Sequence, residues 1–310
     1  MRLIEILWGR HVQYRKLIKN KSSESLRHTN NLLVLFAGAG LTRRYLDLPN
    51  WRGLLVEILK LSGETMPLEF FLQKTDKTYL DDDLVEVAED IAELVHRWAW
   101  STEGRKIFPI QYYDQNISHN IFFKHLVAET LKKNVINNEN YLDEIRALKQ
   151  LKTNLIVTTN YDYFLEDLFK LPVDVGTNIS AGSSNNKILK VHGSQSQPES
   201  IVILPSDYDQ FSLNHKYIFS KLLVHFIEDT CLFLGYSLSD AHIQTLLFDA
   251  CEATKRDKLD NVFLLDYTDE PQTAKNDDTS FTLHKDRRSA SINLISTTEF
   301  EWVYRLFTHS

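Results

Sequence analysis

The sequence predicts an α/β fold, namely a Rossmann-like parallel sheet with helices on both faces. Short apolar segments such as NLIVTT and CLFLGYS alternate along the chain with segments whose apolar residues recur at helical spacing. The first apolar segment, residues 32–37 (LLVLFA), carries no polar side chain and is followed by a glycine. Such a segment is typical of a strand buried on both faces of a parallel sheet, and the alternation places helices against both of those faces.

The chain begins with a segment outside this alternation. Residues 1–31 predict a helix followed by a polar connector, KNKSSESLRHTNN, and we interpret them as an N-terminal helical extension to a domain that spans residues 32–310. A helix is expected from Asn50, whose side chain can cap it. Residues from about 63 to 150 predict a helical insert, in which the acidic run 81–83 suits a helix N-terminus because the helix dipole favours negative charge there.

Strands and helices alternate again after the insert. We expect strands at NLIVTT, KILKVHG, IVILP, CLFLGYS, NVFLLD and SINLIS. Helical spacing predicts helices over residues 161–169, 207–229, 240–255 and 299–307. The polar segment 268–288 is expected to be a mobile surface loop.

Composition excludes several classes of protein. The 310 residues include 35 basic and 42 acidic side chains, and the net charge of -7 argues against nucleic acid as the main partner. Cys231 and Cys251 lie in apolar segments without a Cys-x-x-Cys partner, so we expect no disulfide framework, no zinc ribbon and no metal site. No apolar run reaches the roughly 18 residues that span a bilayer, and no signal peptide is recognisable. We therefore expect a cytoplasmic protein without a membrane partner.

Glycine and polar residues follow four of the predicted strands. These segments are Gly38–Thr42, Thr159–Asp162, His192–Ser194 and Gly235–Asp240. Because ligands of open α/β sheets bind outside the carboxyl ends of the strands, the four segments are the candidate site.

The glycine segment after the first strand admits two interpretations. Gly38 and Gly40 allow the backbone to turn sharply and to approach a ligand closely, and unpaired N–H groups together with Arg43 and Arg44 could hold phosphate. However, Arg43 stands where the third glycine of a G-x-G-x-x-G dinucleotide motif belongs. A structural turn and a phosphate site therefore both remain open.

The other segments also have structural alternatives. Asn160 or Asp162 could cap the helix expected near residue 163, and Asp240 or its neighbour could cap the next one. His192 is either structural or catalytic, and Tyr208 either borders the site or packs in the core. The joint occurrence of these residues at successive strand ends favours a ligand site.

Together the motifs resemble the sirtuin-like superfamily, and most closely its bacterial branch of NAD-consuming antiphage defence domains. The resemblance covers residues 32–248 in order. It runs through GAGLT (38–42), DLPNW (47–51), NISHNIFFKHL (116–126), TTNYDYFLEDLF (158–169), VHGS (191–194), SDYDQF (206–211) and FLGYSLSDAHIQTLL (233–247).

The resemblance implies roles for individual residues. It implies that Asn160 orients the ribose or the attacking water, that Asp162 lines the nicotinamide site and that His192 acts as a base. Thr42 stands in place of a sirtuin serine, and Thr159 in place of a glutamine. Trp51, with two tryptophans of the insert, is expected to pack among helices. The residues expected to bind NAD are Gly38, Ala39, Gly40, Thr42, Trp51, Thr159, Gly193, Gly235, Ser237 and Asp240.

Two departures argue against protein deacylation. The four zinc-binding cysteines of deacylating sirtuins are absent, and IVILPSDY follows VHGS in place of their Phe-Gly-Glu peptide-binding strand. The resemblance therefore implies an NAD glycohydrolase that cleaves the bond between nicotinamide and ribose, with NAD as its substrate and no metal. The alternative is a regulatory module that binds NAD or an ADP-ribose derivative without turnover. NAD-dependent deacylation is a weaker alternative.

The resemblance also implies a biological setting, the toxic effector of a bacterial antiphage system that acts by abortive infection. Such effectors work as homo-oligomers, joined to a sensor domain or partner subunit such as a repeat sensor, an ATPase or an Argonaute-like protein, and respond to a phage protein. The chain ends in an amphipathic segment, FEWVYRLFTHS, with no sensor domain after it. A longer protein and a separate sensor subunit are therefore both open.

Overall fold

The computed structural model of the chain describes residues 2–29, 32–46, 48–73, 81–132, 141–176, 186–208, 216–238, 240–269 and 279–308. Its core is one eight-stranded sheet with the strand order β3-β4-β2-β1-β5-β6-β8-β7. Neighbouring strands are parallel except β7 and β8, which pair antiparallel. The predicted α/β class with a mostly parallel sheet is therefore confirmed.

The strands are β1 (Leu33–Ala37), β2 (Leu155–Thr158), β3 (Val173–Val175), β4 (Lys187–Lys190), β5 (Thr230–Leu234), β6 (Lys258–Tyr267), β7 (Ser280–Lys285) and β8 (Arg288–Thr297). The α-helices include α1 (Arg2–His28), α2 (Ala39–Tyr45), α3 (Trp51–Leu61), α4 (Leu68–Leu72), α5 (Asp81–Ala99), α6 (Ile121–Leu131), α7 (Leu142–Lys149), α8 (Phe164–Phe169), α10 (Lys216–Glu228), α11 (Ala241–Thr254) and α12 (Glu301–Thr308). Short 3-10 helices are η1 (Gly104–Lys106), η2 (Ile110–Tyr113) and η4 (Pro198–Ser200).

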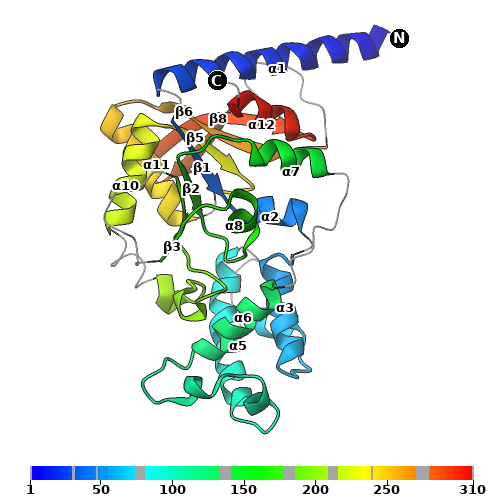
Figure 1. The fold of residues 1–310 in the computed structure, drawn as a ribbon, viewed down its shortest axis with the longest axis vertical. Helices are drawn as coiled ribbons and strands as arrows, with labels where there is room; N and C mark the ends of the chain where they lie inside the picture. Colours follow the sequence, from blue (N-terminus) through cyan, green and yellow to red (C-terminus); the bar gives the residue numbers. More distant parts are fainter. Residues whose placement is uncertain are drawn as a thin grey trace.

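Helices cover both faces of the sheet, as the sequence predicts (Figure 1). Successive side chains of β1 point to opposite faces, so that Leu33, Leu35 and Ala37 belong to one buried cluster while Val34 and Phe36 belong to another. Helices α1, α2, α7, α8 and α12 contribute to the first cluster, and α10 and α11 contribute to the second. Because β1 is buried on both sides, its sequence is apolar throughout instead of alternating.

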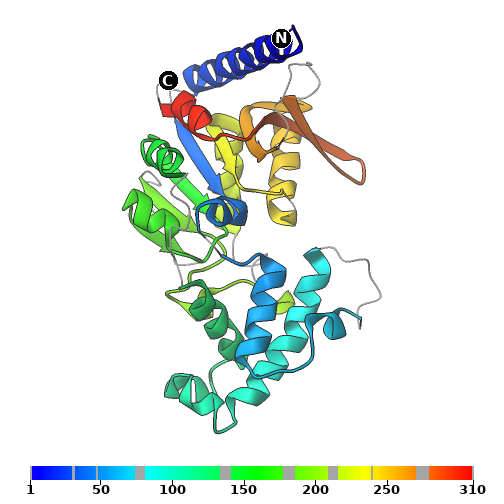
Figure 2. The ribbon, with the colours of Figure 1, turned by 90° about the vertical axis from the view of Figure 1, so that its right-hand side faces the viewer.

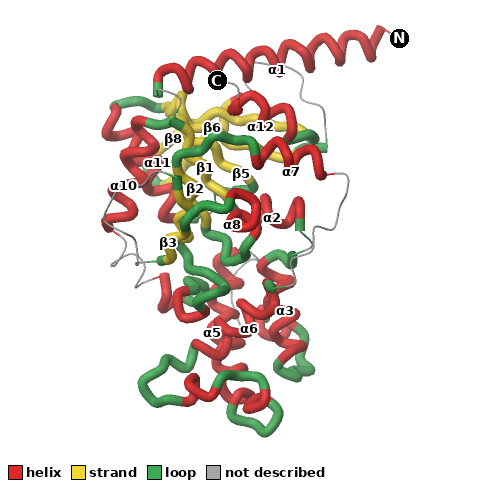
Figure 3. The backbone as a smooth tube through the Cα atoms, viewed as in Figure 1, coloured by secondary structure: helices red, strands yellow, loops and turns green. Residues whose placement is uncertain are grey.

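A third apolar cluster forms a helical layer beyond the carboxyl ends of the strands (Figures 2 and 3). Helices α3, α4, α5 and α6 pack there around buried side chains that include Leu55, Ile91 and Phe123. Helix α7 packs instead against one face of the sheet, where Ile145 and Leu148 join the cluster that contains α12.

Two helix starts predicted from the sequence are confirmed. Asn50 caps α3, because its side-chain oxygen accepts a hydrogen bond from the Gly53 N–H at 2.7 Å. Helix α5 begins at Asp81, the first residue of the acidic run.

The prediction of a polar connector after the first helix is wrong. Helix α1 continues through this segment to His28. The composition indicated a loop because Lys, Asn and Ser dominate, but one side of these turns is buried against the sheet. Leu26 is buried there, and the Ser25 hydroxyl is hydrogen bonded to the Thr230 hydroxyl at 2.8 Å.

The expected strand IVILP is not a strand. Ile201 and its neighbours are buried in the helical layer, but they run outside the sheet. Their N–H groups find other partners, since the Val202 N–H donates to the His192 carbonyl and the Ile203 N–H donates to the Asp207 carboxylate. An apolar run indicates burial, and burial here comes without strand pairing.

Two further strands were not expected. Residues 280–285, inside the segment predicted as a loop, form β7, which pairs with β8 and buries Leu283. Residues 270–278 of that segment lie outside the described residues. Strand β3 is only three residues long, which is too short for a recognisable pattern.

No helix in the described ranges combines the length and the apolar composition needed to cross a lipid bilayer.

Two loops at the carboxyl edge of the sheet touch through their backbones. The Gly38 N–H donates to the Leu234 carbonyl, and the Gly40 N–H donates to the Gly235 carbonyl, both at 2.9 Å. A side chain at residue 235 would place its Cβ 1.9 Å from the Leu41 nitrogen, and the backbone there has a φ of +62°. The contact between the loops after β1 and β5 therefore requires glycine at residue 235.

We predict that Gly235→Ala lowers the free energy of unfolding by about 3 kcal/mol, because the new Cβ forces the two loops apart. Gly63→Ala is the matched control, since Gly63 also has a positive φ, +70°, but no atom within 4 Å of its Cβ position. That control should lose only about 1 kcal/mol. Urea unfolding of both variants measures the difference, and equal losses would show that the loop contact contributes nothing beyond backbone strain.

Candidate functional site

The four predicted segments lie side by side at one edge of the sheet. In the strand order, β4, β2, β1 and β5 are consecutive neighbours, so the segments that follow them form a row. His192 follows β4, Asn160 follows β2, Gly38 follows β1 and Gly235 follows β5. The sheet thus brings together residues that are far apart in the sequence.

Asn160 is buried and held in one orientation. Its side-chain N–H₂ group donates to the Gly38 carbonyl at 2.9 Å and to the Thr42 hydroxyl at 2.7 Å. Its backbone N–H donates to the Thr158 hydroxyl, which in turn donates to the Ala37 carbonyl. Because both amide hydrogens have partners in the protein, the side-chain oxygen is the atom that remains to accept a hydrogen bond from a ligand.

Asp162 is buried close to Asn160 and lies two residues before the start of helix α8. Its carboxylate accepts a hydrogen bond from the Phe164 N–H at 2.9 Å, so its predicted role as a helix cap is met in part. Burial raises the pKa of this carboxyl above its ordinary value, while the Phe164 N–H, Lys190 and Thr42 act in the opposite direction. Thr42 therefore touches both Asn160 and Asp162.

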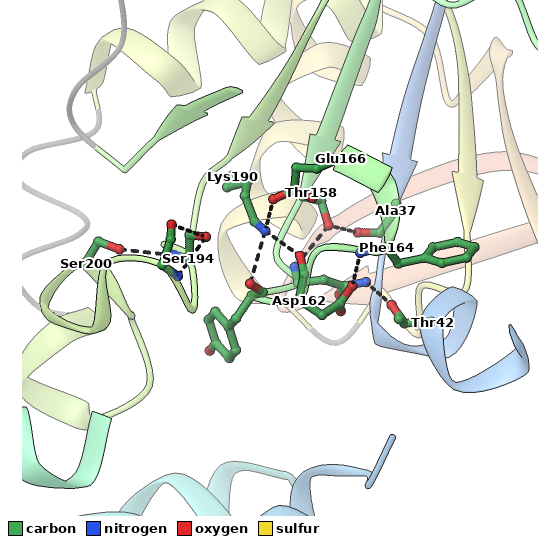
Figure 4. A network of polar contacts seen from close by, with 12 residues as sticks. Ala37, Thr42, Thr158, Asp162, Phe164, Glu166, Lys190, Ser194 and Ser200 are labelled. Carbon is green, nitrogen blue, oxygen red and sulfur yellow. Dashed lines mark hydrogen bonds and ion pairs between the residues drawn. The ribbon is translucent and has the colours of Figure 1, made fainter. Parts of the chain in front are cut away.

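A fully buried lysine, Lys190, supports the loop that carries these two residues (Figure 4). Its ammonium donates to the backbone carbonyls of Tyr161 and Asp162, at 3.0 and 2.5 Å, and to the Glu166 carboxylate at 2.5 Å. Lys190 was not among the residues expected from the sequence. A signal was present, because a lysine inside the otherwise apolar strand KILKV must find a buried partner.

His192 is buried at the end of β4, close to two other side chains. Its Nε2 atom lies 3.5 Å from a carboxylate oxygen of Asp240, and the Tyr208 ring presents its edge or face to the imidazole at a centroid distance of 5.8 Å. Tyr208 therefore lies beside His192 and also packs against the core on one face of the sheet. The Gln195 N–H donates to the Tyr161 carbonyl at 3.0 Å, which links the His192 loop to the Asn160 loop.

Several polar groups of the glycine segment after β1 are bonded within the protein. The N–H groups of Gly38, Gly40 and Leu41 all donate to carbonyls of the protein. Arg44 points away to Glu144, to which it donates two hydrogen bonds of 2.7 and 2.9 Å. These three amides and Arg44 therefore have partners within the protein, because the glycines approach the backbone at the end of β5 closely, whereas Arg43 is exposed.

The remaining candidates surround this row. Thr159 accepts a hydrogen bond from the Tyr236 hydroxyl at 3.4 Å, whereas Ala39 and Ser237 are exposed. Gly193 has a φ of +94° and packs directly on the Ser200 carbonyl. Trp51 begins α3 and packs against the helical layer, as its spacing predicts.

Within the described ranges, no three His, Cys, Asp or Glu side chains are grouped as metal ligands. A cavity of about 420 Å³ is lined by residues such as Lys149, Asn154 and Asn186. Asn154 and Asn186 precede β2 and β4, so this cavity lies at the sheet edge opposite the candidate site.

The chain is similar to known proteins. Residues 154–289 match the family model of the SIR2-like domain, which includes Asn160, Asp162, His192 and Asp240 but not the glycine segment after β1. The chain is 27% identical over 231 residues to NAD(+) hydrolase ThsA of Cytobacillus dafuensis, covering 71% of this chain and 38% of that protein. It is 23% identical over 157 residues to NAD(+) hydrolase ThsA of Bacillus cereus (strain MSX-D12), covering 48% and 32%. The chain spans between 32% and 38% of the length of these curated relatives.

We predict that Lys190→Met lowers the free energy of unfolding by about 3 to 5 kcal/mol, because two carbonyls and the Glu166 carboxylate lose their buried partner. Hydrogen exchange of the backbone around residues 160–164 should also accelerate. Lys187→Met is the matched control, since Lys187 lies in the same strand but pairs with Asp174. Unchanged exchange at residues 160–164 in Lys190→Met would contradict the supporting role of Lys190.

We predict that Asp162→Asn stabilises the protein at alkaline pH. The folded-state pKa of Asp162 is raised above its ordinary value of 3.8, so the folded chain binds this proton more tightly than the unfolded chain. The free energy of unfolding therefore falls as pH rises from about 3.8 through the folded-state pKa, and it stays lower above it. Asparagine cannot titrate but keeps an oxygen for the Phe164 N–H. Urea unfolding should show the variant to be more stable than wild type at pH 8, with a gap that narrows toward pH 4; a gap independent of pH would exclude titration of Asp162 as its cause.

Proposed function

We propose that this chain, which contains a SIR2-like domain, is an NAD glycohydrolase that cleaves the bond between nicotinamide and ribose. The observation that carries the proposal is the row of Asn160, Asp162 and His192 at the ends of neighbouring strands, beside two glycine loops in backbone contact. The similarity to two proteins named NAD(+) hydrolase supports the same reaction.

Cleavage of the bond between nicotinamide and ribose requires polar groups that are held in fixed positions. Nicotinamide leaves as a neutral molecule and takes the electron pair of the C–N bond, so the site mainly has to stabilise positive charge that develops on the ribose. The oxygen of Asn160, held by two hydrogen bonds from its own amide group, is placed to interact with that ribose or with the attacking water. We assign Asp162 to the nicotinamide side of the site.

His192 is the proposed general base. It takes a proton from water as the water oxygen bonds to the ribose carbon, and the products are nicotinamide and ADP-ribose. A positioned base of this kind contributes about a hundred- to ten-thousand-fold to the rate. We assign Gly38, Ala39, Gly40, Thr42, Trp51, Thr159, Gly193, Gly235, Ser237 and Asp240 to the surroundings of the bound NAD.

The organisation of the chain follows the same proposal. Residues 1–31 are an N-terminal extension, and residues 32–310 are the NAD-cleaving domain with a helical insert at about 63–150. Helices α3 to α6 have an apolar cluster of their own, which supports the interpretation that they form a separate layer next to the carboxyl ends of the strands. We assign no metal to the site.

We also propose that the activity serves antiphage defence in the bacterial cytoplasm, where depletion of NAD stops growth of an infected cell. The chain would act as a homo-oligomer with a sensor domain or partner subunit, released by a phage protein. Expression of wild type and of Asn160→Ala in infected bacterial cultures tests this role. Wild type should deplete NAD and reduce phage yield, and equal yields in the two cultures would reject the defence role.

We predict that Asn160→Ala and His192→Ala each lower kcat for nicotinamide release from NAD by at least about a hundredfold. Asn116→Ala and His284→Ala repeat these substitutions at exposed positions and should retain wild-type activity. Nicotinamide release by the purified chain measures the rates. Activity that persists in both site variants would reject the assigned mechanism.

The same samples distinguish the two alternatives. Saturable binding of NAD by calorimetry, with all NAD recovered intact, would favour a regulatory module over an enzyme. Release of an acyl group from an acylated peptide only in the presence of NAD would favour a deacylase. Under the proposed function, neither outcome is expected.

A further inference from the structure

The side chain of Asp240 uses its two oxygens in different ways. Oδ1 accepts hydrogen bonds from the N–H groups of His242 and Ile243, at 2.8 and 3.1 Å, and so caps helix α11. Oδ2 lies 3.5 Å from Nε2 of His192. Helix capping therefore accounts for only one of the two carboxylate oxygens.

We propose that Asp240 is a positioning residue, which orients the His192 imidazole for its role as a base. This inference rests on the proposed function of His192. It differs from direct binding of NAD, because Asp240 acts here through another side chain.

The geometry makes this carboxylate a rigid support. Two backbone hydrogen bonds hold Oδ1, so the direction of Oδ2 is fixed by the first turn of α11. The side chains of His192 and Asp240 are only 7% and 15% exposed, so the attraction between them is weakly screened by water. The Tyr208 ring also packs nearly perpendicular to the imidazole and limits the space in which it can rotate.

The contact also selects a tautomer of His192. A carboxylate facing Nε2 favours the imidazole that carries its hydrogen on Nε2, which leaves the lone pair on Nδ1. The proton of the attacking water then moves to Nδ1, and the resulting imidazolium is stabilised by the carboxylate at Nε2. A 3.5 Å separation before the substrate binds is consistent with this role, because catalytic hydrogen bonds are often long in the free enzyme.

A single substitution separates positioning from capping. Asparagine is as good a helix cap as aspartate, so Asp240→Asn keeps α11 intact but removes the charge that faces His192. Asn50 performs the same capping function at α3 without a charge. Asp240→Ser also keeps a capping oxygen and serves as a second variant. Urea unfolding checks that both variants remain folded.

Kinetics of nicotinamide release form the first test. We expect Asp240→Asn to lower kcat by about ten- to a hundredfold with KM for NAD within about twofold of wild type. In the His192→Ala background, Asp240→Asn should cause no further loss, because the two residues act as one unit. Asp143→Asn, at an exposed carboxylate in α7, is the matched control. A fall in kcat that is equally large in the His192→Ala background, or a change confined to KM, would overturn the inference.

Spectroscopy of His192 forms a second test that needs no turnover. In protein labelled with ¹⁵N in its histidine rings, the signals of His192 are those lost in His192→Ala. We expect wild type to show the Nε2–H tautomer and Asp240→Asn to show a changed tautomer ratio. An unchanged ratio would overturn the inference even where NAD is cleaved. If wild type does not cleave NAD but its tautomer ratio still changes in Asp240→Asn, the proposed function is rejected. The contact between Asp240 and His192 would nevertheless be confirmed.

Discussion

The candidate site depends on direct contact between two backbones, those of the loops after β1 and β5. The Gly38 and Gly40 N–H groups are bonded to carbonyls at the end of β5, and Gly235 lies against Leu41 with no room for a side chain. This contact fixes where α2 begins. Helix α2 in turn places the Thr42 hydroxyl within hydrogen-bond distance of the Asn160 side chain. The glycines therefore act on the ligand site indirectly, by bringing two strand ends close enough to share one set of polar groups.

The buried side chain of Lys190 imposes a second constraint on the site. The ammonium of Lys190, which is fully buried, holds the carbonyls of Tyr161 and Asp162 and is balanced by Glu166. An isolated buried charge is costly, so this cluster is stable only while all its partners stay in place. The loop that presents Asn160 and Asp162 is thus rigid because moving it would leave a charge unpaired. Such preorganised polar groups are what a reaction with a developing positive charge requires.

Much of the site could be predicted from the sequence because parallel strands end at one edge. Apolar runs at 32–37, 155–158 and 231–234 identified β1, β2 and β5, and the residues after them became the candidates. Resemblance to sirtuin-like domains then ranked Asn160, Asp162 and His192 among them. The errors arose where composition and structure diverge: Lys and Ser residues in α1 suggested a connector, and the buried run at 201–204 suggested a strand.

The sequence by itself determined the class of the fold and the strand ends at which polar residues gather, since burial on both faces leaves an apolar signature that short-range patterns reveal. Only the tertiary structure decided what those residues touch. It turned the Gly38 and Gly40 amides toward β5 and Arg44 toward Glu144, and it brought Asp240 next to His192 although the two lie far apart in the sequence. Such contacts depend on strand order and loop approach, which are set by the packing of the whole sheet.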